Sequence, residues 1–207
     1  MCGIVGIYLK TKKFEKSLGS LLSEMLESME SRGPDSAGFA IYKKENDENF
    51  KYSICINDFD FEDLKEKLNK YIKKFDITKN SDHVILKTET KPVEVLNILK
   101  NNFKDMSLVG YGKSIEIFKQ VGNPKDVVKK FKLNEYSGTH GIGHTRMATE
   151  SAITTDGSHP YSTGEDECLV HNGSLSNHNN LRRKLKKNGV IFNSENDTEV
   201  AAGYISN

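Results

Sequence analysis

The first apolar residues of the chain follow a strand pattern and then a helix pattern. Residues 3–9 form a short, mainly apolar run that predicts a buried strand. Residues 37–42 predict a second strand. The helix between them is expected to end at Arg32–Asp35, because Pro34 cannot continue it and Gly33 suits a helix C-cap. Its apolar positions are three or four residues apart, as on one helix face, and are Phe14, Leu18, Leu21, Leu22, Met25 and Met29.

The middle of the chain, from about residue 43 to residue 138, mixes the two patterns and is rich in lysine. Strands are predicted at 51–56, 84–86, 107–109 and 114–118. Helical faces are predicted at 61–72, after Pro92 and after Asn123-Pro124. This block contains no motif that suggests chemistry. We therefore expect one domain over 1–207 with an inserted mixed subdomain at about 43–138.

Polar residues crowd into short runs after Gly141. Two more helical stretches are predicted, one with Leu181 and Leu185 and one at the end of the chain. The candidate chemistry of this half therefore lies in four segments, which are Gly141–Thr149, Ser158–Pro160, Leu169–Gly173 and Asn193–Glu199.

Composition narrows the classes of protein. The 30 basic and 29 acidic residues are interspersed and nearly cancel, which argues against a nucleic-acid surface. No apolar run approaches the roughly 18 residues of a membrane span, and no secretory signal follows Met1. The three cysteines are isolated, so we expect a reducing, cytoplasmic protein without disulfides.

Cys2 is the first candidate for chemistry, because it follows Met1 directly. Removal of Met1 would place a thiol and a free α-amino group on the same residue. Their reference pKa values are about 8.5 and about 7.7–8.0, which suit a nucleophile and a weak base at neutral pH. The alternative is that Cys2 is an ordinary small residue at the start of a strand.

Three downstream groups, one of them a pair of neighbouring residues, could complete such a site. The guanidinium of Arg146 suits a carboxylate held by two parallel hydrogen bonds, although a surface ion pair is the alternative. Asn172 and Gly173 offer a side-chain amide and a backbone N–H as oxyanion donors, but Asn-Gly is also a common hairpin turn. Asp197 precedes a predicted helix, so it could bind a cation or cap the helix.

Six motifs in order resemble the class II glutamine amidotransferases, which are N-terminal-nucleophile hydrolases. They are Cys-Gly-Ile-Val-Gly-Ile at the N-terminus, Arg-Gly-Pro-Asp-Ser-Ala-Gly, His-Thr-Arg-Met-Ala-Thr, His-Pro, His-Asn-Gly and Asp-Thr-Glu. The resemblance covers residues 1–42 and about 139–205. Within the class, His171–His178 and Ser194–Glu199 are most similar to the amidotransferase portion of archaeal-type glutamate synthases. The implied fold is α/β of the α+β kind, a four-layer αββα sandwich of antiparallel sheets between helices.

The resemblance implies a role for each matching residue. Cys2 would be the nucleophile that attacks the glutamine side-chain amide, with Asn172 and Gly173 as the oxyanion hole. Arg146, with Thr149 nearby, would hold the glutamine α-carboxylate, and Asp197 would hold its α-ammonium.

Other residues are expected to support these. Arg32 and Gly33 match a loop packed near the nucleophile, and we expect His144 and His171 to support Arg146 and Asn172. A zinc site among the histidines is not expected, since His140 and His144 are about 13 Å apart on a strand. We expect no metal or other cofactor, and Cys55 and Cys168 are interpreted as small buried apolar residues.

The expected function is hydrolysis of L-glutamine, with ammonia passed to a synthase subunit or domain, first of all a glutamate synthase. The alternatives are the glutaminase part of an amidotransferase that makes glucosamine phosphate, phosphoribosylamine or asparagine, another amidase, and a non-catalytic glutamine sensor. Arg146 and Asp197 together argue against another amidase. Met147 and Glu150 depart from several relatives. Because the sequence ends ten residues after Asp197, we expect the C-terminal part of the family domain to be absent.

Overall fold

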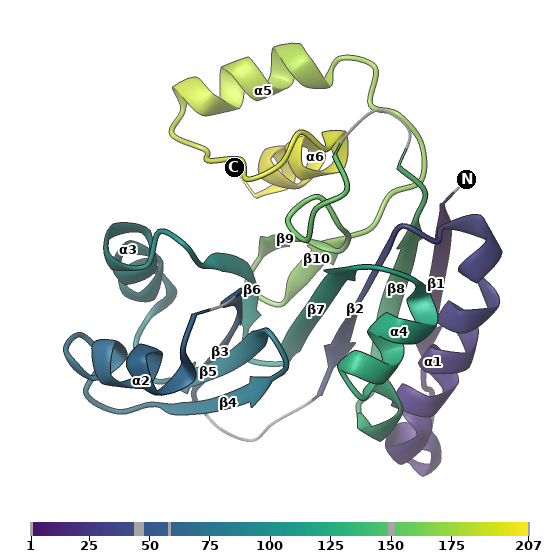
Figure 1. Ribbon diagram of the computed structural model, residues 1–207, viewed down its shortest axis with the longest axis horizontal. Coiled ribbons are helices and arrows are strands. Elements are labelled where there is room, and N and C mark those ends of the chain that lie inside the picture. The colour runs from purple at the N-terminus through teal and green to yellow at the C-terminus, as the bar shows by residue number, and fades with distance from the viewer. Residues whose placement is uncertain (1, 44–47, 58, 149–151, 207) are drawn as a thin grey trace.

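A four-stranded antiparallel sheet forms the centre of the protein, in a computed structural model that describes residues 2–43, 48–57, 59–148 and 152–206. Its strand order is β1-β8-β2-β7 (Figure 1). The first and last thirds of the chain therefore meet in one sheet. The strands are β1 (Gly3–Tyr8), β8 (His140–Arg146), β2 (Ser36–Tyr42) and β7 (Ile115–Val121).

Helices α1 (Leu18–Ser28) and α4 (Pro124–Lys130) pack against one face of this sheet. Two short 3-10 helices, Lys12–Ser17 and Glu30–Arg32, flank α1, and a third, Leu133–Glu135, follows α4. The core between them contains Leu22, Leu26, Phe39 and Phe118. The sequence predicted that this helix includes Phe14. The observed α1 begins only at Leu18, because Lys12–Ser17 forms a tighter 3-10 helix instead.

A second antiparallel sheet has the order β4-β5-β3-β6. Its own apolar core, around Tyr52, Ile54 and Leu64, packs under α2 (Phe61–Asn69) and α3 (Pro92–Asn102). The strands are β3 (Phe50–Cys55), β4 (Asp76–Asn80), β5 (His83–Thr88) and β6 (Ser107–Gly112).

The segment expected to be an insert, about residues 43–138, is divided between the two sheets. The second sheet and its helices lie within 50–112, whereas β7 pairs with β2 along its whole length and α4 covers the first sheet. The sequence pattern placed 114–138 in the insert because local periodicity cannot show which strand is the partner. A separately folding subdomain therefore stays a proposal.

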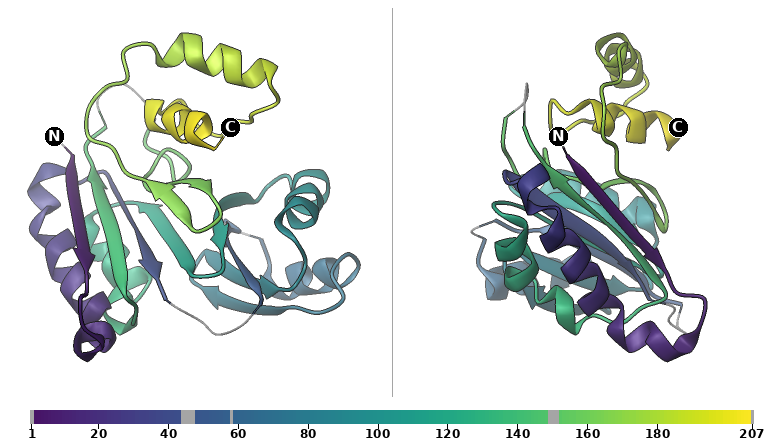
Figure 2. Two further views of the ribbon diagram at one scale, coloured as in Figure 1. Left: turned by 180° about the vertical axis from the view of Figure 1, so that it is seen from behind. Right: turned by 90° about the vertical axis from the view of Figure 1, so that its right-hand side faces the viewer.

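The opposite face of the first sheet carries a two-stranded ribbon, β9 (Tyr161–Gly164) and β10 (Glu167–Leu169). Cys168 packs there against Ala40 and Ile117, and the Tyr42 hydroxyl lies 3.4 Å from its sulfur. Figure 2 shows α5 (His178–Lys187) and α6 (Asp197–Ile205) beyond this ribbon. The protein is thus a mixed α and β fold with antiparallel sheets, as expected, while the four-layer sandwich stays a proposal.

None of the helices in the described ranges is long and apolar enough to cross a lipid bilayer.

Candidate active site

The ends of β1 and β8 place Cys2 beside Arg146. In the antiparallel register Gly3 lies opposite Thr145, so the residue before Gly3 reaches the level of Arg146. The Cys2 sulfur lies 3.8 Å from the carbonyl oxygen of Met147, just after the strand. Cys2 is partly exposed, whereas Arg146 is only 4% exposed. A partly exposed Cys2 and a buried Arg146 therefore lie at the same end of the sheet.

The segment around Gly33 packs against the ends of β1 and β8, where Cys2 and Arg146 lie. A methyl group on Gly33 would lie 2.4 Å from the carbonyl carbon of Thr145, so the backbones touch directly. The carboxylate of Asp35 accepts a 2.7 Å hydrogen bond from the backbone N–H of Ala148. Arg32 Nε donates to the carbonyl oxygen of Cys2 at 3.4 Å. Arg32 thus contacts the backbone of Cys2, and Gly33 packs against the end of β8.

Gly33 is not the C-cap of α1 that the sequence suggested. The α1 C-cap is Met29, and Gly33 follows the short 3-10 helix with a φ of −153° and a ψ of 82°. The glycine is needed for its lack of a side chain against β8, which is a long-range contact that local sequence rules cannot predict.

Asn172 and Gly173 reach Cys2 from the other half of the chain. The Asn172 side-chain amide donates a 3.0 Å hydrogen bond to the Cys2 carbonyl oxygen. Gly173 has a φ of +155°, and a side chain there would also approach His171. The sequence placed this pair at the end of a strand or in a hairpin turn. In the structure β10 ends at Leu169, and the pair lies in an irregular segment before α5.

Asp197 is the first residue of α6, but it does not cap the helix. The N-cap is Asn196, whose side chain accepts from the backbone N–H of Thr198 at 2.9 Å. One carboxylate oxygen of Asp197 instead accepts from the backbone N–H of Leu175 at 2.6 Å. This bond ties the segment after Gly173 to the start of α6.

Two stacked histidines lie beneath the site. The His144 and His159 rings are 3.9 Å apart, and His144 Nε2 lies 3.0 Å from the His171 carbonyl oxygen. Burial lowers the pKa of His144 to about 4, and the pKa of His159 is well below its usual range for the same reason. His144 is therefore neutral at pH 7, and its Nε2–H donates to that carbonyl. His171 in turn contacts the Thr198 hydroxyl at 3.3 Å.

Six of the predicted site residues line one cavity of about 640 Å³, whereas Arg32, Gly33 and His144 lie outside its lining. Cys2, Arg146, Asn172, Gly173 and Asp197 all line it, together with His171. Thr149, expected near the carboxylate clamp, lies outside the described residues. Three residues that support the site gave no periodic signal in the sequence, because they act through individual hydrogen bonds or ring contacts. They are Asp35, His159 and Asn196.

The arrangement offers a thiol, amide donors, a cation and an anion around one space. A thiol beside an amide donor is suited to acyl transfer, because the donor can stabilise a developing oxyanion. A guanidinium and a carboxylate in the same cavity suit a zwitterion. The Cys2 cavity is thus suited to amide chemistry on an amino acid.

Comparison with known proteins agrees with this geometry. A family model described as "Glutamine amidotransferase domain" matches residues 133–206. The glutamine amidotransferase-like protein GlxB of Rhizobium meliloti is 49% identical over 209 residues, spanning 100% of this chain and 69% of that protein. A glutamine–fructose-6-phosphate aminotransferase of Aquifex aeolicus is 40% identical over 102 residues, spanning 49% of this chain and 17% of its own length. Because GlxB is 49% identical and the match covers the whole of this chain, the protein belongs to the glutamine amidotransferase family.

Proposed function

We propose that this protein is a class II amidotransferase that hydrolyses L-glutamine to L-glutamate and ammonia through a thioester on Cys2. The observation that carries the proposal is the shared cavity of Cys2, Asn172, Arg146 and Asp197. L-Glutamine presents one carboxylate, one ammonium and one side-chain amide, so it needs a cation, an anion and a nucleophile at separate places. The cavity supplies all three.

The chemistry would start with removal of Met1, which frees the α-amino group of Cys2. That amine takes the thiol proton, and the sulfur attacks the side-chain carbonyl carbon of glutamine. Negative charge develops on the carbonyl oxygen, where the Asn172 amide and the Gly173 N–H can donate. The C–N bond then breaks, the amine returns its proton to the leaving ammonia, and water hydrolyses the thioester to glutamate.

Asn172 provides further support, since its amide already points at the Cys2 residue. It donates to the Cys2 backbone oxygen at 3.0 Å, so a modest reorientation would bring the same N–H to a bound amide oxygen. Hydrogen bonds of this kind often reach their final geometry only with substrate present. Loss of one such donor costs about 10²–10³ in rate in other enzymes.

We further propose that the ammonia passes to a synthase subunit or domain, with a flavin-containing glutamate synthase as the first candidate. Free ammonia in neutral water is mostly protonated and is then no longer a nucleophile, so direct transfer is advantageous. Similarity to part of a glutamine–fructose-6-phosphate aminotransferase favours a second candidate, the glutaminase part of a sugar-phosphate amidotransferase. No nucleic-acid or membrane partner is proposed, and the proposed compartment is the cytoplasm.

Glutamate release from L-glutamine tests the proposal. Cys2→Ala is expected to abolish release, whereas the matched control Cys168→Ala is expected to keep it, because Cys168 lies on β10, packs against the first sheet and does not line the cavity. Folding of both variants is checked by circular dichroism. Full activity of Cys2→Ala would rule out the nucleophile. Adding either synthase, with its own acceptor substrate, then separates the two candidate partners.

A further inference from the structure

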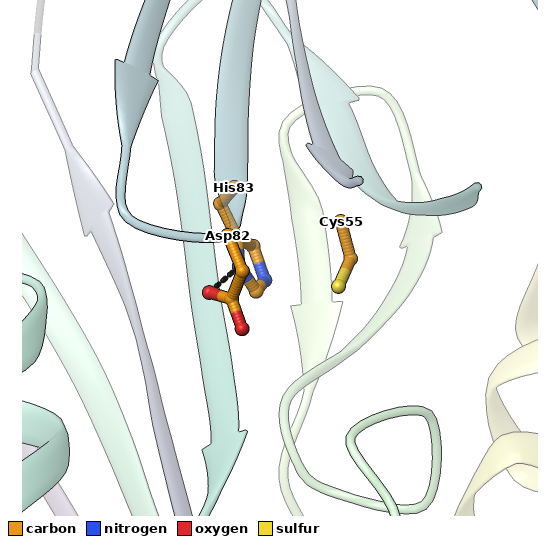
Figure 3. Close-up of side chains that lie close together, drawn as sticks. All are labelled: Cys55, Asp82 and His83. Atoms are coloured by element: carbon orange, nitrogen blue, oxygen red, sulfur yellow. Dashed lines mark hydrogen bonds and ion pairs between the residues drawn. The ribbon is translucent and has the colours of Figure 1, made fainter. Parts of the chain in front are cut away.

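Buried and partly buried polar side chains lie on both sides of β7. On the side of α4, Asp82 Oδ1 lies 3.0 Å from His83 Nδ1, and Lys130 Nζ donates to Asp82 Oδ2 at 2.9 Å. Figure 3 shows Asp82 and His83 together with the nearby Cys55. These contacts join α4 to the second sheet, and none of the four residues lines the Cys2 cavity. Lys119 lies on the other side of β7, under the ribbon of β9 and β10.

Lys119 is a buried cation on this ribbon side. The residue is 5% exposed, and its Nζ lies 4.4 Å from the centre of the Tyr161 ring on β9. Nζ donates to the backbone oxygen of Ser158 at 2.9 Å and to that of Asp156 at 3.2 Å. Burial lowers the pKa of Lys119 to about 8, so most of it is still protonated at pH 7. Because a charge taken out of water needs partners, these two bonds hold the turn at 154–158 against β7.

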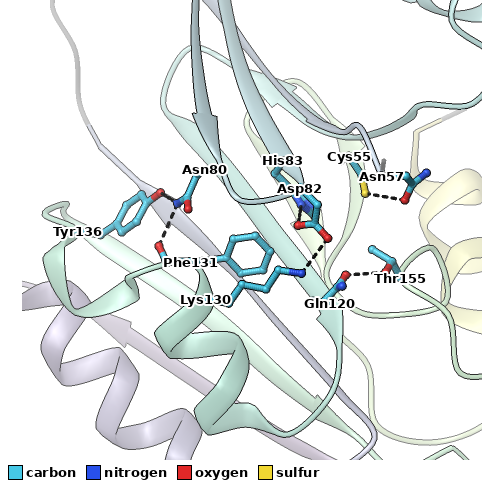
Figure 4. Close-up of polar contacts among 10 residues, drawn as sticks. All are labelled: Cys55, Asn57, Asn80, Asp82, His83, Gln120, Lys130, Phe131, Tyr136 and Thr155. Atoms are coloured by element: carbon cyan, nitrogen blue, oxygen red, sulfur yellow. Dashed lines mark hydrogen bonds and ion pairs between the residues drawn. The ribbon is translucent and has the colours of Figure 1, made fainter. Parts of the chain in front are cut away.

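The turn that Lys119 holds has further bonds of its own. The Thr155 hydroxyl donates to Gln120 Oε1, also on β7, at 2.7 Å (Figure 4). The Gly157 N–H donates to the Thr154 hydroxyl at 3.0 Å. The position of this backbone is therefore set by β7 and by contacts within the turn.

Two bonds connect the turn and its neighbour Ala152 to the charged residues of the Cys2 cavity. Arg146 Nη1 donates to the backbone oxygen of Ala152 at 3.2 Å, two residues before the turn. Asn196 Nδ2 donates to the backbone oxygen of Gly157 at 3.2 Å, and Asn196 is the N-cap directly before Asp197. Since Arg146 and Asp197 both line the cavity, the same piece of backbone is linked to the cation and to the anion.

We propose that Lys119 is a positioning residue for amino-acid binding, which fixes the turn at 154–158 and, through it, the spacing of Arg146 and Asp197. The inference rests on the proposed function, because it assigns these two charges to the α-carboxylate and α-ammonium of glutamine. Lys119 is not among the described residues that line the Cys2 cavity, so it acts through the turn and does not touch the substrate. A misplacement of about 1 Å can cost on the order of 100-fold in an enzyme, so a distant residue can matter this much.

Lys119→Met tests the role, because methionine is also long and unbranched but lacks the ammonium. Calorimetry measures the Kd for L-glutamine in a Cys2→Ala background, in which the proposed nucleophile is absent and the amide stays intact. The Kd is expected to rise at least tenfold. Lys51→Met is the matched control, since Lys51 is 2% exposed, donates to Glu116 at 3.0 Å and lines a different cavity. Its Kd should stay within twofold of the parent, and circular dichroism checks the folding of both variants.

A second readout uses the chain with Cys2 intact. Lys119→Met should raise KM for L-glutamine at least tenfold and change kcat less than threefold. Its preference for L-glutamine over glutaramic acid, which lacks the α-ammonium, should fall at least threefold. Alkylation of Cys2 by iodoacetamide, which carries neither charge of an amino acid, should keep its wild-type rate. A general loss of structure would not change the first three quantities in this pattern.

The possible failures can be told apart. Unchanged Kd and KM in folded Lys119→Met, or an equal loss in Lys51→Met, would overturn this inference and leave the proposed function standing. No glutamine binding by the Cys2→Ala parent, with no glutamate release by the wild type, would contradict the proposed function and the inference with it. If Lys119→Met does not fold, Thr155→Val takes its place, because it removes only the hydroxyl bonded to Gln120. Its Kd should rise at least threefold, and an unchanged Kd would overturn the inference.

Discussion

Arg146 and Asp197 line one cavity from different parts of the chain, and their opposite charges suit the two ends of an amino acid. Arg146→Lys keeps the charge but cannot hold a carboxylate with two parallel hydrogen bonds. We expect glutamine binding to weaken by about 2 kcal/mol, or about 30-fold in KM, with a smaller change in kcat. An unchanged KM in steady-state kinetics would remove Arg146 from the clamp.

Asp197→Asn tests the other charge. An asparagine oxygen can still accept from Leu175 N–H, so the start of α6 should keep its position while the negative charge is lost. KM for glutamine should rise by a similar factor. A substrate analogue without the α-amino group is the control, since its KM should not change between the wild type and this variant.

The lowered pKa of His144 predicts how the free energy of unfolding depends on pH. Its pKa is about 4 in the folded protein and about 6.5 in an unfolded chain, so the unfolded state binds more protons between these values. The free energy of unfolding should therefore be full above pH 6.5 and should fall by on the order of 3 kcal/mol toward pH 4. His83 and His159, whose pKa values are also lowered, add to this slope.

Urea unfolding followed by circular dichroism at several pH values measures this loss. His144→Asn lowers stability at pH 7 but should show a shallower slope between pH 6.5 and pH 4. An equal slope in the wild type and the variant would show that His144 does not contribute to it.

At the scale of the elements, the contact between the Gly33 segment and β8 positions the end of β8, where Arg146 lies near Cys2. A side chain at Gly33 would lie 2.4–2.6 Å from backbone atoms of Thr145 and Arg146, which cannot move without separating the two segments. Gly33→Ala should cost about 1–3 kcal/mol of unfolding free energy and reduce glutamate release.

Gly6→Ala is the matched control for that substitution. It lies on β1, and a methyl group there would make only ordinary contacts, 3.6 Å from Ile142 and 3.9 Å from the Gly141 carbonyl oxygen. Its melting temperature and activity should stay close to those of the wild type. Equal effects of the two substitutions would show that the close approach at Gly33 is not what matters.

The strength of the sequence signal depended on the kind of element. Amphipathic or apolar elements, such as β1, β2 and α1, were predicted because their side chains repeat with a clear period. β4 was not, since its residues are mostly polar and it lies at a sheet edge. The pairing of β7 with β2 could not be predicted either, because no local pattern encodes a partner 73–85 positions away.

For the site, the sequence motifs identified candidate residues but not the contacts between them. Cys2, Arg146, Asn172, Gly173 and Asp197 line one cavity, and their roles in catalysis stay a proposal. The bonds that orient them run to backbone atoms, as from Asn172 to Cys2 and from Leu175 to Asp197. Such bonds depend on how loops that are distant in sequence approach one another, and local sequence patterns do not predict that.

At the scale of the whole molecule, the cavity opens to solvent beside a partly exposed Cys2, so a partner could cover it. We expect low glutamate release by the chain alone and stimulation of at least tenfold by the cognate synthase with its acceptor. Co-purification from native extract identifies candidates, and a turnover assay with each one measures the effect. Full-speed turnover without any partner would instead indicate a free-standing glutaminase.

The most direct test of the central claim is covalent trapping by the glutamine analogue 6-diazo-5-oxo-L-norleucine. Its diazoketone carbon alkylates a nucleophile placed at the amide position, with loss of dinitrogen, and the reaction needs no ammonia acceptor. Intact-mass and peptide mass spectrometry of the purified protein should show loss of Met1 and a single adduct on Cys2, and excess L-glutamine should prevent the adduct. A retained Met1 with no adduct, or an adduct on Cys55 or Cys168 instead, would contradict the account.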